Sequence, residues 1–116
     1  MKFINMSGKR LFAAQVMDLE RLDALICTPT EETLNLIDCP MDLSDDGYIA
    51  KAKKLIDIFD LNNGDIVHIS GVDLNLVSHM KSLAPQVTYV YSKIEKKHGD
   101  FGINKFMGFK TLYNLS

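Results

Sequence analysis

Short apolar runs alternate along this chain with longer stripes of apolar residues. An apolar run of about four to eight residues that ends in small or polar residues is typical of a buried strand. Four such runs lie at residues 2–7, 23–29, 65–71 and 87–94 (KFINMS, DALICTP, DIVHISG and VTYVYSKI). A fifth run, FMGFKTLYNL at residues 106–115, follows a polar loop and is expected to form an antiparallel strand at one edge of the sheet.

Three of the segments between these runs carry apolar residues at helical spacing. Ser44 and Asp73 can cap the second and third of these helices, which then end near Gly64 and Pro85. The stretch at residues 30–43 fits either a short helix or an extended segment. The stripes expected to face inward are Phe12, Val16 and Leu19; Tyr48, Ile49, Ala52, Leu55, Ile56 and Phe59; and Leu74, Val77, Met80 and Leu83.

The order strand, helix, strand, helix predicts the fold class. Successive strands joined through helices make right-handed crossovers, which produce a mainly parallel sheet covered by helices on both faces. We therefore expect one α/β domain over residues 1–116, a three-layer Rossmann-like sandwich with an antiparallel C-terminal edge strand.

Composition narrows the class of protein. The chain has 116 residues, the size of one domain, and lacks both a run of about 20 apolar residues and the apolar core of a signal peptide. We expect a cytoplasmic protein that does not enter the membrane. Cys27 and Cys39 do not form a metal-binding pattern and are expected to be reduced thiols in or near the core. With a net charge of −2, any polyanion must be held by a local basic patch.

Polar and basic residues follow three of the predicted strands. In an open parallel sheet, ligands bind beyond the carboxyl ends of the strands. The three segments there contain Asn5, Ser7, Gly8, Lys9 and Arg10; Ser70, Gly71, Asp73 and Asn75; and Ser92, Lys93, Lys96, Lys97 and His98. The lysines and the N–H groups of the helix that begins near Asp73 would attract a phosphate. Neither GxxxxGK[ST] nor GxGxxG is present, and an ordinary surface with a Ser-Gly turn explains the same pattern.

The histidines and acidic pairs do not form a catalytic or metal constellation by spacing. His68 lies inside a strand between Val67 and Ile69, so a structural role is expected for it rather than a catalytic one. Asp45 and Asp46 open a helix, where capping explains them better than metal binding. No metal and no other cofactor is predicted.

Four segments, taken in order, resemble a known family. They are FINMSG followed by LFAAQ, GDIVHISGVDLNLVSHM, VTYVYSKIE and GFKTLYNL. Together they are similar to small stand-alone CRISPR-associated proteins of type III systems, which act as ring nucleases or as sponges for cyclic nucleotides. That family opens with a strand, a small polar loop and a helix with a glutamine one turn in. The resemblance covers most of the chain except roughly residues 30–43.

The resemblance implies a fold, a ligand and a reaction. The fold is Rossmann-like and related to the CARF sensor domains for cyclic oligoadenylates, and the family usually forms homodimers. The ligand is cyclic tetra- or hexa-adenylate, a messenger of antiviral defence, rather than DNA. Cleavage needs no metal, because a ribose 2′-OH attacks the neighbouring phosphate and leaves a 2′,3′-cyclic phosphate. Cleavage or sequestration of the ring switches the signal off.

The resemblance also assigns residues to the site. Contacts to phosphate, ribose or base fall on Asn5, Ser7, Gly8, Ser70, Gly71, Asp73, Asn75 and Ser92, with Lys9 and Lys93 as charge partners. The candidates for catalysis are Ser7, Asn75 and Lys93.

One departure from the family leaves the activity open. Relatives often carry Ser-His after the first strand, whereas this chain has Ser7-Gly8. The missing histidine removes general acid–base help, which is worth about 10²–10⁴-fold in rate. The alternatives are a ring nuclease, a non-catalytic sponge for the same ring, and an α/β interaction subunit with no nucleotide ligand.

Overall fold

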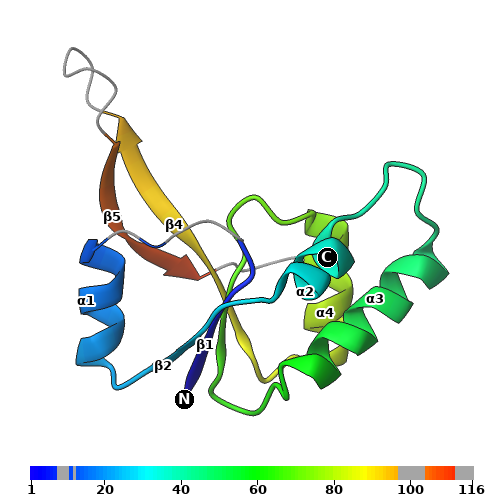
Figure 1. Cartoon of the computed structure of the whole chain (residues 1–116), viewed down its shortest axis with the longest axis horizontal. Helices are drawn as coiled ribbons and strands as arrows, with labels where there is room; N and C mark the ends of the chain where they lie inside the picture. The colour runs from blue at the N-terminus through cyan, green and yellow to red at the C-terminus, as the bar shows by residue number, and fades with distance from the viewer. Residues whose placement is uncertain (8–10, 12, 97–103, 112–116) are drawn as a thin grey trace.

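The computed structural model of the chain describes residues 1–7, 11, 13–96 and 104–111 (Figure 1). Of the strand residues 93–96 and 104–107 it describes only the backbone. Gly8, Lys9 and Arg10, which were assigned to the predicted site, lie outside the described residues, as do Lys97 and His98.

One five-stranded sheet organises the molecule. Its strands are β1 (Lys2–Asn5), β2 (Leu25–Cys27), β3 (Ile66–His68), β4 (Thr88–Lys96) and β5 (Asn104–Thr111). They lie in the order β2-β1-β3-β4-β5. The first four are parallel, whereas β5 pairs antiparallel with β4 at the edge. The predicted mainly parallel sheet and its antiparallel C-terminal strand are both confirmed.

Helices cover both faces of this sheet. Figure 1 shows α1 (Ala13–Arg21) on one side, with α2 (Glu31–Ile37), α3 (Asp45–Ile58) and α4 (Leu74–Leu83) on the other. Residues 30–43, for which the sequence allowed a helix or an extended segment, are partly helical. Thr30 caps α2 by accepting a hydrogen bond from the N–H of Thr33. The three-layer Rossmann-like arrangement is as predicted.

The core has one part on each face of the sheet. The larger part lies under α2, α3 and α4 and contains Ile4, Val67, Ile69, Leu76 and Met80 among others. The smaller part lies under α1 and is built from Phe3, Leu19 and Val90, with the partly buried Ile66 and Phe109 packed against it. Successive residues of a strand point to opposite faces, so β1 sends Ile4 into the larger part and Phe3 into the smaller one.

The predicted inward face of α4 was partly wrong. Leu74 and Leu83 are 59% and 44% exposed, whereas Leu76, Val77 and Met80 are completely buried. Residues three apart turn by about 300° on a helix, so each step drifts about 60° from the last. Across three such steps Leu74 and Leu83 end up on opposite sides of the helix. A spacing that mixes steps of three and four, as at Asp73, Leu76, Val77, Met80 and Ala84, keeps to one face.

At the amino edge of the sheet an acidic side chain is buried and fully engaged. Asp65 accepts hydrogen bonds from the backbone N–H groups of Lys2 (2.9 Å) and Asn62 (2.8 Å), and its carboxylate lies 3.2 Å from Lys2 Nζ. Burial by itself would raise the pKa of Asp65, but these donors outweigh it and lower the pKa below its usual value. Three other buried polar side chains, Asn5, Gln15 and His68, lie toward the opposite, carboxyl edge.

Within the described part of the chain, no helix is long and apolar enough to cross a membrane. Cys27 and Cys39 are both free thiols of intermediate burial, as predicted.

Candidate functional site

Six polar side chains meet where β1 and β3 end, beside α1 and the middle of β4; Ser92, which was expected after its strand, lies inside β4. This polar cluster consists of Asn5, Ser7, Gln15, His68, Ser70 and Ser92. Asn5, Gln15 and His68 are buried, with exposed fractions of 3–4%, whereas the three serines are partly exposed. The amide and imidazole groups therefore form the buried floor of the cluster, and the hydroxyl groups form its partly exposed rim.

The strand register explains why these residues meet. Asn5 of β1 pairs with His68 of β3, which in turn pairs with Val90 of β4. Side chains of paired residues point to the same face, and so do residues two apart on one strand. On this face β1 and β3 change from apolar to polar at their carboxyl ends, and β4 changes at Ser92, in its middle, just beyond its pairing with β3. The pairs that show this change are Phe3 and Asn5, Ile66 and His68, and Val90 and Ser92.

His68 is the centre of the hydrogen-bond network. Its Nδ1 lies 2.9 Å from Oδ1 of Asn5, and its Nε2 lies 2.7 Å from Oγ of Ser92 and 3.0 Å from Oγ of Ser70. The amide oxygen of Asn5 can only accept a hydrogen bond, so Nδ1 carries the proton. In the neutral ring Nε2 is then an acceptor that faces two hydroxyl groups.

The neighbouring groups orient those hydroxyls. Ser92 Oγ accepts a hydrogen bond from Gln15 Nε2 at 2.7 Å, and Ser70 Oγ accepts one from the backbone N–H of Ser92 at 2.9 Å. With their oxygens accepting from those groups, either hydroxyl can donate to the single lone pair of His68 Nε2. On the other side, the hydroxyl of Ser7 donates to Oδ1 of Asn5 at 2.6 Å.

Aromatic side chains keep the imidazole dry. The His68 ring stacks on Phe3 with 5.8 Å between centroids, and Phe109 meets it edge-on at 5.4 Å. Burial disfavours the charged imidazolium and lowers the pKa of His68 to about 4. At pH 7 the ring is therefore neutral, with its basic nitrogen directed at Ser70 and Ser92.

The order Asn5, His68, Ser92 has the chemical logic of a hydroxyl activated by an oriented base. An amide holds one ring nitrogen, and the other ring nitrogen accepts the proton of a hydroxyl. Such a group can take a proton from a hydroxyl placed against Ser92. Among the described residues there is no group of three His, Cys, Asp or Glu side chains arranged to hold a metal ion.

The structure brings together four of the predicted site residues: Asn5, Ser7, Ser70 and Ser92. It adds His68, which the sequence interpretation treated as structural, and Gln15, to which it gave no role. The signal that points to His68 is positional: polar residues replace apolar ones on one face of three neighbouring strands. This signal does not reach Gln15, which lies on α1.

The other predicted residues lie elsewhere or outside the described part. Asn75 is exposed in the first turn of α4, where its backbone N–H donates to the carboxylate of Asp73 at 2.8 Å. Gly71 and Asp73 line a cavity next to the cluster. Lys93 belongs to β4, but its side chain is not among those described, and the same is true of Lys96.

That cavity has a volume of about 480 Å³ and opens between the ends of β1 and β3. The chain leaves β1 through α1 to reach β2 on one side, and β3 lies on the other side of β1. A point where the connections diverge in this way is where open α/β sheets bind ligands. The cavity is lined by Met6, Ser7, Leu34, Ile37, Asp38, Cys39, Gly71, Val72 and Asp73.

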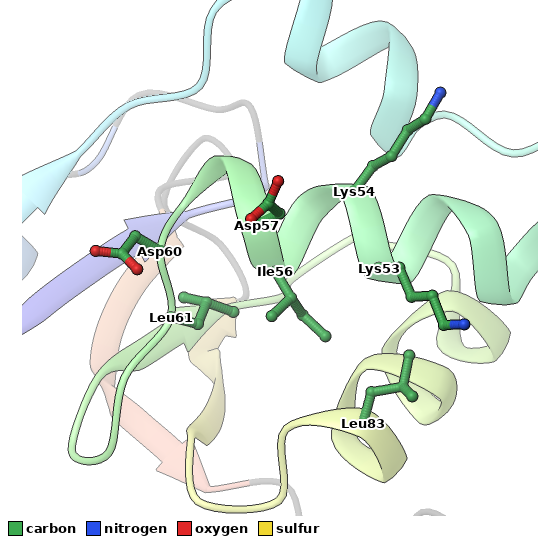
Figure 2. Close-up of a pocket in the computed structure, with 7 residues that line it drawn as sticks. All are labelled: Lys53, Lys54, Ile56, Asp57, Asp60, Leu61 and Leu83. Atoms are coloured by element: carbon green, nitrogen blue, oxygen red, sulfur yellow. The ribbon is translucent and has the colours of Figure 1, made fainter.

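A second hollow of about 600 Å³ lies between α3 and the end of α4, away from the polar cluster (Figure 2). In Figure 2 Ile56 points toward α4, whereas Lys54 and Asp57 point away from it. It is lined by positively charged, negatively charged and aliphatic side chains: Lys53, Lys54, Ile56, Asp57, Asp60, Leu61 and Leu83. No residue of the polar cluster contributes to it, so we place the candidate site at the carboxyl edge.

No family model, curated protein or solved structure matches the chain. The residues of the site and the sequence resemblance described above are what point to a function.

Proposed function

We propose that the chain binds cyclic oligoadenylate at the carboxyl edge of its sheet and cleaves the ring without a metal, which switches off type III CRISPR signalling. The observation that carries the proposal is the polar cluster, in which a neutral imidazole faces two partly exposed serine hydroxyls. This arrangement supports proton removal from a ribose hydroxyl, the step on which metal-independent cleavage of RNA-like phosphodiesters depends.

In the proposed reaction the ribose 2′-OH lies against Ser92. Its proton passes to Ser92 Oγ while the proton of Ser92 passes to Nε2 of His68, whose Nδ1–H stays bonded to Asn5. The 2′-oxygen attacks the adjacent phosphorus, and the bond from phosphorus to the 5′-oxygen breaks. The 5′-oxygen takes up the proton that His68 has received. The products are a 2′,3′-cyclic phosphate and a 5′-hydroxyl.

The cyclic ligand suits a homodimer, which presents the same binding surface twice. A cyclic oligoadenylate repeats its phosphates by rotation, and a two-fold dimer repeats its binding loops in the same way. Lys9 and Lys93 are the predicted charge partners of the phosphates in this arrangement, and Ser7 and Ser70 supply neutral hydrogen bonds.

A second candidate function is sequestration of the ring without turnover. It is favoured by the low pKa of His68, about 4, because such a group takes up a proton weakly at pH 7. The same contacts would then hold the ring, and cleavage would be slow or absent.

The test is incubation of the purified chain with cyclic tetra-adenylate or hexa-adenylate in the presence of EDTA. Linear products that end in a 2′,3′-cyclic phosphate are expected. Ser92→Ala and His68→Gln are expected to lower the rate by about 10²-fold or more and to flatten its pH profile. Ser82→Ala, an exposed position on α4, is the matched control and should cleave like the wild type.

The three candidate functions separate in this assay when calorimetry is added. Intact ring at excess protein rejects the nuclease, and tight binding of that intact ring supports sequestration. A chain that neither binds nor cleaves the ring is instead the interaction subunit without a nucleotide ligand.

A further inference from the structure

The cavity beside the polar cluster differs from it in charge. Among the lining residues that the structure describes are two carboxylates, Asp38 and Asp73, and no lysine or arginine. Lys51 is close by, but its ammonium donates to the backbone carbonyls of Leu36 and Asp38, at 3.0 Å each. A phosphate is therefore disfavoured in this cavity, and a group that donates hydrogen bonds is favoured.

Asp73 is held rigidly at the wall of the cavity. Tyr48 donates its hydroxyl to Oδ2 at 2.9 Å, and the backbone N–H of Asn75 donates to Oδ1 at 2.8 Å. Tyr48 is in turn stacked on His79, with 5.8 Å between ring centroids. A carboxylate offers about four acceptor positions, so these two donors leave capacity for another.

The remaining walls suit a flat, uncharged ring. Met6, Leu34, Ile37 and Val72 are the apolar residues in the lining of the cavity. Burial, followed by the nearby Asp73 carboxylate, raises the pKa of Cys39, so its thiol stays neutral. Gly71 has φ of +76°, and no atom lies within 4 Å of where a Cβ would stand, so a ligand can approach its backbone.

The size and position of the cavity agree with a small ligand next to the cluster. Its volume of about 480 Å³ falls in the range of about 300–1,000 Å³ that is usual for small-molecule sites. Ser7 belongs to both features, since it lines the cavity and donates a hydrogen bond to Asn5 of the cluster. A ligand that spans the two would place a planar group in the cavity and a ribose-phosphate at the hydroxyl rim.

We propose that this cavity is the base subsite and that it selects nucleobases with an exocyclic amine, with Asp73 as the acceptor. The N6 amine of adenine donates to the carboxylate of Asp73, and the ring lies between the apolar walls. A base with a carbonyl oxygen at that position, such as hypoxanthine, brings two acceptors together and is rejected. The proposal rests on the proposed function for the identity of the complete ligand.

The experiment compares adenosine with inosine by NMR titration of the full chain. Wild-type protein is expected to bind adenosine at least about tenfold more tightly than inosine. Asp73→Asn should reduce this preference to about twofold or less, because an amide can donate to the inosine oxygen as well as accept from an amine. Asparagine is also a good N-cap, so α4 should survive the substitution. Asp42→Asn, exposed and outside the cavity, is the matched control.

Equal affinity for the two nucleosides, or no binding of either, overturns the base subsite; the wild-type comparison alone decides this if Asp73→Asn does not fold. An unchanged preference in Asp73→Asn overturns the role of Asp73. Titration with cyclic tetra-adenylate separates the two proposals. Ring bound without nucleoside discrimination removes the subsite and keeps the proposed function, whereas selective adenosine binding without ring binding does the reverse.

Discussion

A single imidazole combines most of the chemistry at the candidate site. His68 is held by Asn5 on one nitrogen and by two serines on the other, and its ring packs against Phe3 and Phe109, which also contact each other. The environment that aligns the ring also prevents it from ionising. Orientation and basicity are therefore opposed at this residue. For this reason cleavage of the proposed ligand and its sequestration without cleavage are both candidate functions.

The His68 environment predicts a loss of stability in mild acid. The pKa falls from 6.5 to about 4 on folding, so between those values the unfolded chain binds more protons than the folded chain. The contribution of His68 to the free energy of unfolding should be fully present above about pH 6.5. It should be lost as the pH drops toward 4, by about 3 kcal/mol in all. Urea denaturation of wild type and His68→Gln across this range measures it. An equally steep fall in both proteins contradicts the assignment.

At this scale the sequence predicted four of the six residues of the polar cluster, but not His68, Gln15 or the hydrogen bonds that join them. Asn5, Ser7, Ser70 and Ser92 were expected together because the carboxyl ends of parallel strands share one edge. His68 was interpreted as structural, since a histidine between Val67 and Ile69 is compatible with plain burial. Its partners depend on the register of three strands, which the sequence does not reveal.

At the scale of elements, α4 shows how a plausible stripe can mislead. All four predicted positions are apolar, yet only Val77 and Met80 are buried while Leu74 and Leu83 face outward. The apolar pattern correctly predicted that a helix forms here. Its rotation was decided by packing against the sheet and α3, which places Leu76 inward instead.

Two leucines of α4 test this rotation directly. Leu76 is completely buried, and Leu76→Ala should lower the free energy of unfolding by about 2–5 kcal/mol because it leaves a cavity in the core. Leu74 is 59% exposed, and Leu74→Ala should change it by less than about 0.5 kcal/mol. Chemical denaturation of the two variants compares the same substitution two positions apart. Similar losses in both would mean that the helix is rotated.

At the scale of the whole molecule, the alternation of strands and helices was sufficient to predict the parallel sheet. The short helix α2 was left open, because Leu34, Leu36 and Ile37 fit a helical spacing (34 and 37) as well as an alternating one (34 and 36). The position of the cavity was also beyond the sequence, since it needs the strand order β2-β1-β3-β4-β5 to place β1 beside β3.

The central position of β3 in this layered arrangement gives a stability prediction. Val67 is completely buried, with β1 and β4 on either side, so Val67→Asp introduces an unpaired buried carboxylate. The free energy of unfolding should fall by several kcal/mol, on the order of 3–5. Thr88→Asp, an exposed position on β4, is the control and should melt close to wild type. A Val67→Asp protein with an unchanged melting temperature contradicts the central placement of β3.

The hydrogen bond from Gln15 to Ser92 joins positions 77 residues apart. The hydroxyl that faces His68 is thus aligned by a helix made early in synthesis and a strand made late. A nascent chain still emerging from the ribosome has no working site until β4 has docked beside β3. The polar cluster can therefore be completed only after β4 has been synthesised, long after α1.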